Sequence, residues 1–205
     1  MKEPRFTAIV LAAGLSTRMK DFKPLLPLGE TTVVDHALAT FRVPGVDTYL
    51  VVGHRQAEVQ SAVARPDVSI VPNPDCQKGM FSSVQAGVRR LRAGYTAFFL
   101  LPADIPLVSP ATITALMDAA RQSPGAILYP VYQGKRGHPP LIPAELISDI
   151  LAWNQEGGLQ AVLRRHESLA LDVPVDDEAI LRDIDTMEDY EALVAWQKSH
   201  PRGQV

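Results

Sequence analysis

The sequence predicts an α/β fold built around a mostly parallel sheet, and two observations carry the prediction. Between residues 6 and 131, apolar runs of strand length bounded by Gly, Pro, Asn or Asp alternate with amphipathic stretches at helical spacing. Repeated strand–helix units of this kind assemble into parallel sheets that are covered by helices. The chain also has the size and composition of one ordinary globular domain, with 205 residues of which 46% are hydrophobic and 21% charged.

The predicted elements follow one another in a regular order. Strands are expected at residues 6–13, 48–52, 68–71, 97–101 and 126–131, and helices at residues 33–41, 56–64, 82–91 and 111–121. The pattern changes after Tyr132, where residues 134–143 are rich in Gly, Pro and basic side chains; helical spacing returns at residues 144–153 and 159–165. A strand at residues 169–175 then precedes a last helix that begins at Thr186 and has Glu188 and Asp189 in its first turn.

The charge and the cysteine content narrow the class of partner. The formal net charge of -3 gives no basic surface for nucleic acid or for an anionic membrane. The apolar stretch at residues 8–15 is too short to span a bilayer. The single cysteine, Cys76, cannot form an internal disulfide, which favours a reducing compartment. We therefore expect a cytoplasmic protein that binds small molecules, with no nucleic-acid partner and no membrane.

A turn of small residues followed by two cations comes directly after the first predicted strand: Leu11, Ala12, Ala13, Gly14, Arg18 and Lys23. In an open α/β sheet, ligands bind beyond the carboxyl ends of the strands, and a turn without bulky side chains lets backbone N–H groups approach phosphate oxygens. The two cations suit a triphosphate and a departing pyrophosphate. A solvated basic turn explains the same residues. The sequence contains neither a P-loop nor the three-glycine dinucleotide motif, which excludes those two phosphate sites.

Two aspartates are candidates for a metal site. Asp104 lies between Pro102 and Pro106, directly after a predicted buried strand. Mg²⁺ prefers hard oxygen ligands and usually takes one or two carboxylates, with water and substrate phosphates as its other ligands. Asp185 follows a late strand and precedes the last helix, so it can reach the same edge if that strand joins the sheet. The structural alternatives are a turn or helix cap for Asp104 and the N-cap of the last helix for Asp185.

The loop at residues 73–87 enters a predicted helix and is suited to reading a nucleotide base. The backbone at Gly79 can approach a ring where a side chain would collide, and the hydroxyl of Ser82 or Ser83 can donate to and accept from a pyrimidine edge. An ordinary N-cap role explains Ser82 equally well.

Residues 134–140 combine Lys135, Arg136 and His138 with glycines that permit unusual backbone conformations. The composition suits an anionic acceptor, and Gly137 and His138 are the candidate contacts. A solvated hairpin tip explains the two cations equally well, and a lone histidine is also commonly structural.

In this order, the motifs LAAGLSTRM, KPLLPL, NPDCQKGMFSSVQAG, PADIPLV, GKRGHPPLI and DIDT resemble the molybdenum cofactor nucleotidyltransferase family, in particular the molybdopterin cytidylyltransferases. The resemblance runs from residue 7 to about residue 190. It implies a three-layer, Rossmann-like nucleotidyltransferase fold with Mg²⁺ on Asp104 and with Asp185 as the second metal ligand. It also implies a triphosphate over residues 12–18 and Lys23, and a base near Gly79 and Ser83.

The resemblance also implies the nucleotide and the reaction. Guanylyl-transferring relatives have Gly where this chain has Ala13, so CTP is the expected nucleotide, and the extra methyl would narrow the floor of the base pocket. The implied reaction is Mg²⁺-dependent transfer of CMP from CTP to the terminal phosphate of molybdopterin, with release of pyrophosphate and with Arg18, Lys23 and Asp104 as catalytic residues. A client molybdoenzyme would be contacted transiently. We expect one domain over residues 1–205, with a nucleotide half at about 1–130 and an acceptor half at about 131–198.

The acceptor side departs from the family pattern. Related cytidylyltransferases read G-D-x-G-A-R where residues 156–161 of this chain read EGGLQA. Two alternatives therefore stay open. One is the same chemistry on a sugar phosphate, phosphocholine or another phosphorylated acceptor, and the other is a non-catalytic maturation factor that binds the cofactor for a molybdoenzyme.

Overall fold

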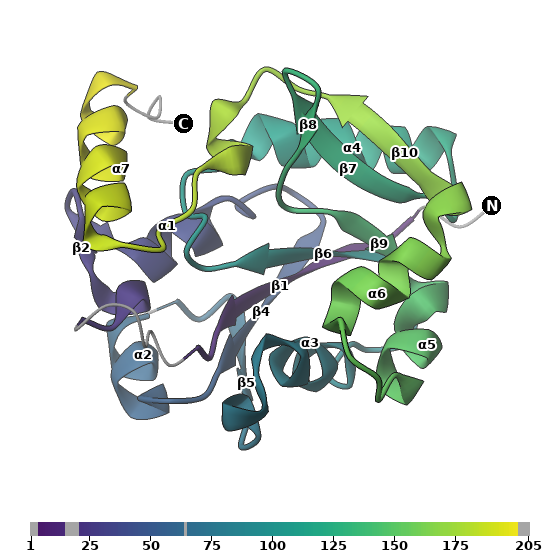
Figure 1. Cartoon of the computed structure of the whole chain (residues 1–205), viewed down its shortest axis with the longest axis horizontal. Helices are drawn as coiled ribbons and strands as arrows, with labels where there is room; N and C mark the ends of the chain where they lie inside the picture. The colour runs from purple at the N-terminus through teal and green to yellow at the C-terminus, as the bar shows by residue number, and fades with distance from the viewer. Residues whose placement is uncertain (1–3, 15–20, 64, 201–205) are drawn as a thin grey trace.

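A mixed sheet runs through the centre of the structure, a computed structural model that describes residues 4–14, 21–63 and 65–200 (Figure 1). Its strands lie in the order β10-β7-β9-β6-β1-β4-β5, with β8 paired to β7. The bounds of these strands are β1 (Phe6–Ala12), β4 (Val46–Val52), β5 (Val68–Pro72), β6 (Ala97–Pro102), β7 (Ile127–Tyr132), β8 (Lys135–Arg136), β9 (Leu141–Pro143) and β10 (Ala170–Pro174). The short strands β2 (Pro27–Leu28) and β3 (Thr31–Thr32) form a separate antiparallel pair.

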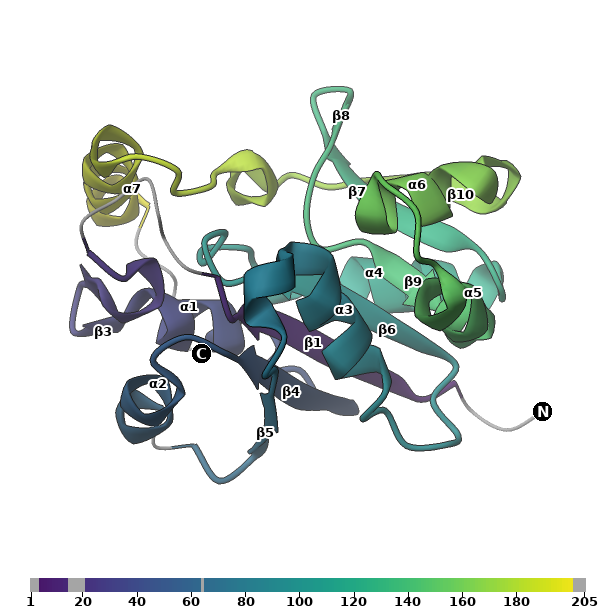
Figure 2. The ribbon, with the colours of Figure 1, turned by 60° about the horizontal axis from the view of Figure 1, so that its bottom comes forward.

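The helices cover both faces of the sheet. They are α1 (Val33–Ala39), α2 (Gln56–Ala62), α3 (Met80–Val88), α4 (Pro110–Gln122), α5 (Ile147–Ala152), α6 (Gly158–Arg165) and α7 (Met187–Ser199). Short 3-10 turns add η1 (Lys23–Leu25), η2 (Cys76–Lys78), η3 (Ala144–Leu146), η4 (Glu167–Leu169) and η5 (Glu178–Leu181). Figure 2 shows α3, α5 and α6 on the near side of the sheet and α4 on the far side.

Strand β1 organises the sheet because it pairs in parallel with both β4 and β6. Its side chains alternate between two buried clusters: Ala8 and Val10 face α1, α2 and α4, whereas Ile9 and Leu11 face α3, α5 and α6. A parallel strand that is buried on both faces reads as a continuous apolar run, as this one does. The predicted three-layer α/β fold is confirmed.

Most predicted elements lie close to their predicted bounds, and two regions differ from the prediction. Residues 144–153, predicted as one helix, divide into η3 and α5. Strand β9 was not predicted, yet it pairs antiparallel with β6 and β7 in the middle of the sheet. Its three residues are all buried and end in a proline, so they show no alternation that periodicity can detect.

The last helix begins as predicted. The Thr186 side chain accepts a hydrogen bond from the Asp189 N–H, and the Asp189 carboxylate accepts from the Thr186 N–H, which makes a capping box at the start of α7. No helix in the described part of the chain has both the length and the apolar character needed to cross a membrane.

Helix α3 packs unusually close to the sheet at Gly87. A Cβ atom at this residue would lie 2.7 Å from the Cγ2 atom of Ile9 and 3.2 Å from the Cγ2 atom of Val51. Both neighbours are fully buried β-branched side chains on central strands, so neither can rotate away.

Replacing Gly87 with alanine should therefore destabilise the protein. In an ordinary helix interior this change stabilises by roughly 0.5–1 kcal/mol, but here overpacking should cost about 1–3 kcal/mol. Urea unfolding followed by circular dichroism measures the difference. Arg89→Ala, on the exposed end of the same helix, should stay within about 0.5 kcal/mol of the wild type. A Gly87→Ala variant more stable than the wild type would show that α3 is not held this close to β1.

Candidate functional site

The carboxyl ends of β1 and β6 bring two of the predicted motifs together. The parallel register sets Leu11 opposite Pro102, and the Ala103 N–H donates to the Leu11 carbonyl oxygen at 3.0 Å. The small-residue turn that includes Gly14 and the loop that carries Asp104 therefore leave the sheet side by side, at the edge where ligands of open α/β sheets bind.

Asp185 follows a late strand that joins the sheet, as the sequence suggested. That strand, β10, pairs with β7 at the edge of the sheet and is separated from β6 by β7 and β9. From β10 the chain returns across the sheet through η5. The Ile184 N–H then donates to the Asp104 carbonyl oxygen at 2.9 Å, which brings Asp185 next to Asp104.

Lys23 lies between the two carboxylates. Its Nζ atom donates to Oδ1 of Asp185 at 3.1 Å and lies 4.0 Å from Oδ2 of Asp104. The Lys23 side chain is only 12% exposed, so this ammonium is held in place and partly shielded from water. Burial raises the pKa of the Asp104 carboxyl to about 6; the Lys23 ammonium opposes the shift, and the carboxylates of Asp183 and Asp185 add to it.

The donor set fits a hard divalent cation that is shared with a substrate. Two carboxylates converge here on either side of the Lys23 ammonium, and carboxylate oxygens are the ligands that a hard divalent cation prefers. Within residues 4–14, 21–63 and 65–200, no group of three or more His, Cys, Asp or Glu side chains could hold a metal ion. Mg²⁺ bound by one or two carboxylates normally takes its remaining ligands from water and phosphates.

A cavity of about 560 Å³ opens over these residues. Most of the predicted nucleotide and metal residues line it: Leu11, Ala12, Ala13, Gly14, Lys23, Gly79, Ser83, Asp104 and Asp185. Its volume is within the range of small-molecule sites. Arg18, the remaining predicted cation, lies outside the described residues.

Ser82, which was predicted to bind the nucleotide, has a different environment from Ser83. Its hydroxyl is within hydrogen-bond distance of the carbonyl oxygens of Asp75 and Gly79, at 2.9 and 2.8 Å, and accepts from the side-chain amide of Asn73 at 3.0 Å. The Asn73 amide also donates to the Ser83 hydroxyl at 2.9 Å. Ser82 thus holds the loop together and is not among the residues that line the cavity, whereas Ser83 is.

The methyl group of Ala13 is almost fully buried. Ala13 is 2% exposed and belongs to the apolar cluster on the α3 side of the sheet. Gly53 lies against it, because a Cβ atom at Gly53 would be 3.0 Å from the Ala13 Cβ and 2.6 Å from the Cys76 Cβ. Ala13 also lines the cavity, so it lies between the cavity and Gly53.

A second cavity, of about 660 Å³, adjoins the first and shares Leu11, Met80 and Pro102 with it. The two predicted acceptor residues, Gly137 and His138, line this second cavity. Burial lowers the pKa of His138, so the ring is neutral near pH 7, and its buried Nδ1 atom has no hydrogen-bond partner among the described residues. Met80, at the junction of the cavities, is 64% exposed despite being apolar.

Sequence reasoning missed an organised arginine at the rim of the second cavity. Arg136 was read as equally compatible with a solvated hairpin tip, but its guanidinium donates to Asp172 at 2.6 Å and to Glu167 at 2.7 Å. It also lies over the ring of Tyr129, 4.5 Å from the centroid. Arg136, Tyr129 and Glu167 all line the cavity, as does Arg164 from α6. Only a fold could reveal this, because the partners of Arg136 lie more than thirty residues further along the chain.

Comparisons with known proteins show what the whole chain is similar to. Residues 8–200 match the family described as the MobA-like NTP transferase domain. The molybdenum cofactor cytidylyltransferase of Escherichia coli (strain K12) is 30% identical over 188 residues, which cover 89% of this chain and 92% of that protein. The crystal structure of Rv0371c from Mycobacterium tuberculosis H37Rv is 27% identical, with a TM-score of 0.84 over 95% of this chain and 100% of that one. A complex of Rv0371c with manganese is 26% identical, with a TM-score of 0.73 over the same shares of the two chains.

Replacing Lys23 with methionine should destabilise the metal-free protein. The substitution removes the ammonium that lies between the carboxylates of Asp104 and Asp185, which should cost about 1–3 kcal/mol at neutral pH. Urea unfolding in the presence of a chelator measures the loss. Added Mg²⁺ should recover part of it, because a second cation replaces the ammonium.

Lys78→Met is the matched control. The Lys78 side chain is 72% exposed and its ion pair with Asp75 lies outside the cluster, so its loss should change the free energy of unfolding by less than about 1 kcal/mol. Equal losses in the two variants, or no recovery of Lys23→Met with Mg²⁺, would contradict a carboxylate pair at this edge.

Proposed function

Since the chain belongs to the MobA-like NTP transferase family and is a nucleotidyltransferase, we propose that it transfers CMP from CTP to the terminal phosphate of a molybdopterin-type acceptor and releases pyrophosphate. One observation carries the proposal. The cluster of Lys23, Asp104 and Asp185 lies in one of two adjoining cavities, each large enough for a small ligand. A transferase with two small-molecule substrates needs this arrangement, because both must reach one reacting phosphorus atom.

The nucleotide occupies the first cavity in this proposal. Backbone N–H groups of residues 11–14 approach the phosphate oxygens, and Lys23 and Arg18 supply the positive charge that stabilises the departing pyrophosphate. The base lies near Gly79, with the hydroxyl of Ser83 as its polar contact and Ser82 holding the loop in shape. The buried methyl of Ala13 sets the height of the cavity floor, which favours a pyrimidine over a larger purine.

Asp104 and Asp185 hold Mg²⁺ in the proposed reaction. The ion, when bound, neutralises charge on the nucleotide phosphates and supplies Lewis-acid stabilisation of the charge that develops on them. With such an ion held by the two carboxylates, the Lys23 ammonium would be available to the phosphates of the nucleotide. Manganese in the complex of Rv0371c supports a divalent ion in this family, and its identity as Mg²⁺ here is part of the proposal.

The acceptor occupies the second cavity and presents its phosphate at the boundary marked by Leu11, Met80 and Pro102. A phosphate oxygen of the acceptor forms a bond to the α-phosphorus while the bond from that phosphorus to the β-phosphate oxygen breaks, so pyrophosphate leaves with the electron pair. A phosphate nucleophile is already ionised near neutral pH, so no general base is needed and positioning carries much of the rate. Gly137 and His138 form part of the wall that orients the acceptor, and Arg136 supplies charge at the rim.

The lining of the second cavity bears on the identity of the acceptor. The walls of the second cavity are mainly apolar, with residues such as Phe81, Tyr129 and Leu159, which suits a flat heterocycle that carries a phosphate. The departure from the family pattern at residues 156–161 falls on this cavity, since Gly157, Gly158, Leu159 and Gln160 line it. A different phosphorylated acceptor would therefore leave the nucleotide half of the proposal intact. A client molybdoenzyme would receive the product in a transient contact.

Asp104→Asn should abolish most of the transfer. Loss of a metal carboxylate should lower kcat at least about 100-fold, measured as pyrophosphate release from CTP, Mg²⁺ and molybdopterin. Asp118→Asn is the matched control, because its ion pair with Arg121 lies on the exposed face of α4. Full activity of Asp104→Asn would refute the metal assignment, and release of pyrophosphate only with another acceptor would correct the substrate. No release with any acceptor by the wild type would favour a carrier over an enzyme.

Arg136→Met should weaken acceptor binding and leave the nucleotide unaffected. The KM for the acceptor should rise roughly 5- to 50-fold, because one charge-assisted contact is worth about 1–2.5 kcal/mol, while the KM for CTP should not change. Lys135→Met, on the same hairpin but not among the residues that line the cavity, is the control. Equal changes in the two KM values would place Arg136 outside acceptor recognition.

A further inference from the structure

The carboxylate of Asp185 is carried by a crossing segment, residues 175–185, that runs from the edge of the sheet back to its centre. We call residues 175–185 the strap. It begins directly after β10, where the Val175 N–H donates to the carbonyl oxygen of Val131 in β7 at 3.0 Å. It ends where the Ile184 N–H donates to the Asp104 carbonyl oxygen at 2.9 Å. The placement of Asp185 next to Asp104 therefore depends on how the strap is held between these two points.

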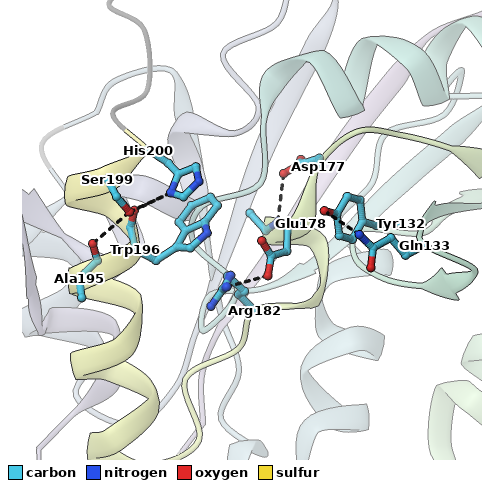
Figure 3. A network of polar contacts seen from close by, with 10 residues as sticks. Tyr132, Gln133, Asp177, Glu178, Arg182, Ala195, Trp196, Ser199 and His200 are labelled. Carbon is cyan, nitrogen blue, oxygen red and sulfur yellow. Dashed lines mark hydrogen bonds and ion pairs between the residues drawn. The ribbon is translucent and has the colours of Figure 1, made fainter.

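Asp177 fixes the first half of the strap. One carboxylate oxygen accepts hydrogen bonds from the Ser109 N–H at 2.8 Å and from the Thr112 hydroxyl at 2.6 Å, both at the start of α4. The other oxygen accepts from the Ala179 N–H at 3.1 Å and so caps η5. Within the strap, Arg182 donates to Glu178 at 2.6 Å. The strap also touches α7, because Arg182 lies over the ring of Trp196, 5.1 Å from its centroid (Figure 3).

Residues 134–140, which we call the acceptor hairpin, fix the middle of the strap. The His138 N–H donates to the Ile180 carbonyl oxygen at 2.9 Å, and Ile180 is 1% exposed. This contact requires a residue without a side chain at Gly137, since a Cβ atom there would lie 2.5 Å from the Ile180 carbonyl oxygen and 2.6 Å from its Cγ1 atom. The first of these atoms is backbone, so the strap would have to move to admit even a methyl group.

We propose that Gly137 is a positioning residue for Asp185: it lets the acceptor hairpin seat directly on the strap, and that contact fixes the metal-binding carboxylate. Only three residues lie between Ile180, which receives the hairpin, and Ile184, which is bonded to Asp104. Ile180 and Ile184 are both buried, in different apolar clusters, so a displacement at the first is passed along a short, packed segment to the second. The wall of the acceptor cavity and the metal carboxylate thus form one connected unit. The inference rests on the proposed function, because it takes Asp104 and Asp185 as the metal pair.

Gly137→Ala tests the proposal through metal affinity, measured by electron paramagnetic resonance of free Mn²⁺ without nucleotide or acceptor. Loss of an outer contact that orients a metal ligand typically weakens metal binding about 10- to 100-fold, and we expect the Mn²⁺ Kd to rise by at least about tenfold. Hydrogen exchange at the Ile184 amide should also accelerate. Two controls should keep the wild-type Kd: Lys135→Ala on the same hairpin, and Gly87→Ala, which destabilises the fold far from the strap.

Asp177→Asn provides a second, independent variant, because it loosens the strap without touching the hairpin. If Gly137→Ala does not fold, as judged by circular dichroism, Asp177→Asn decides the question by the same two measurements. Folded variants with a Mn²⁺ Kd within twofold of the wild type and unchanged exchange at Ile184 would overturn the positioning role.

Asp104→Asn and Asp185→Asn separate this inference from the proposed function. If both aspartate variants weaken Mn²⁺ binding while the strap variants do not, the positioning role alone is wrong. If neither aspartate variant changes the Mn²⁺ Kd, the metal pair and the inference built on it fail together.

Discussion

The contact of the Lys23 ammonium with the carboxylates of Asp104 and Asp185 holds the site together. The Lys23 Nζ atom lies 3.1 Å from Oδ1 of Asp185 and 4.0 Å from Oδ2 of Asp104. Two carboxylates face this ammonium, and burial raises the pKa of Asp104 because the charged carboxylate is poorly solvated there. An arrangement of this kind is ready to exchange its internal cation for a divalent ion and to turn its lysine toward a phosphate. Metal, nucleotide and lysine are therefore expected to rearrange as one system.

The fold brings these three residues together from distant parts of the chain by two means. Parallel pairing of β1 with β6 aligns the small-residue turn with the loop of Asp104, and the strap carries Asp185 back from the far edge of the sheet. The antiparallel strand β9 lies between β6 and β7, and the hairpin that precedes it forms part of the wall of the second cavity. The two cavities consequently meet above the carboxyl ends of the central strands.

Sequence reasoning recovered the parts of the molecule that local chemistry determines. Buried strands such as β1 and the capping box at Thr186 each carry their signal within a few residues. The missing parts are long-range. Strand β9 is too short to show a period, and the network of Arg136 joins three segments of the chain. The role of the strap depends on a close approach at Gly137 that no composition reveals. The two interpretations of Ser82 also could not be separated from the sequence, because its hydroxyl is within hydrogen-bond distance of loop carbonyl oxygens that only the fold brings near.

A crystal structure with CTP and Mn²⁺, with the ion located by anomalous scattering, tests the central claim most directly. We expect the manganese ion to be bound by carboxylate oxygens of both Asp104 and Asp185, and the Lys23 ammonium to have moved from Asp185 to a phosphate oxygen. A nucleotide bound elsewhere, or a manganese ion away from both aspartates with the contact between Lys23 and Asp185 intact, would contradict it.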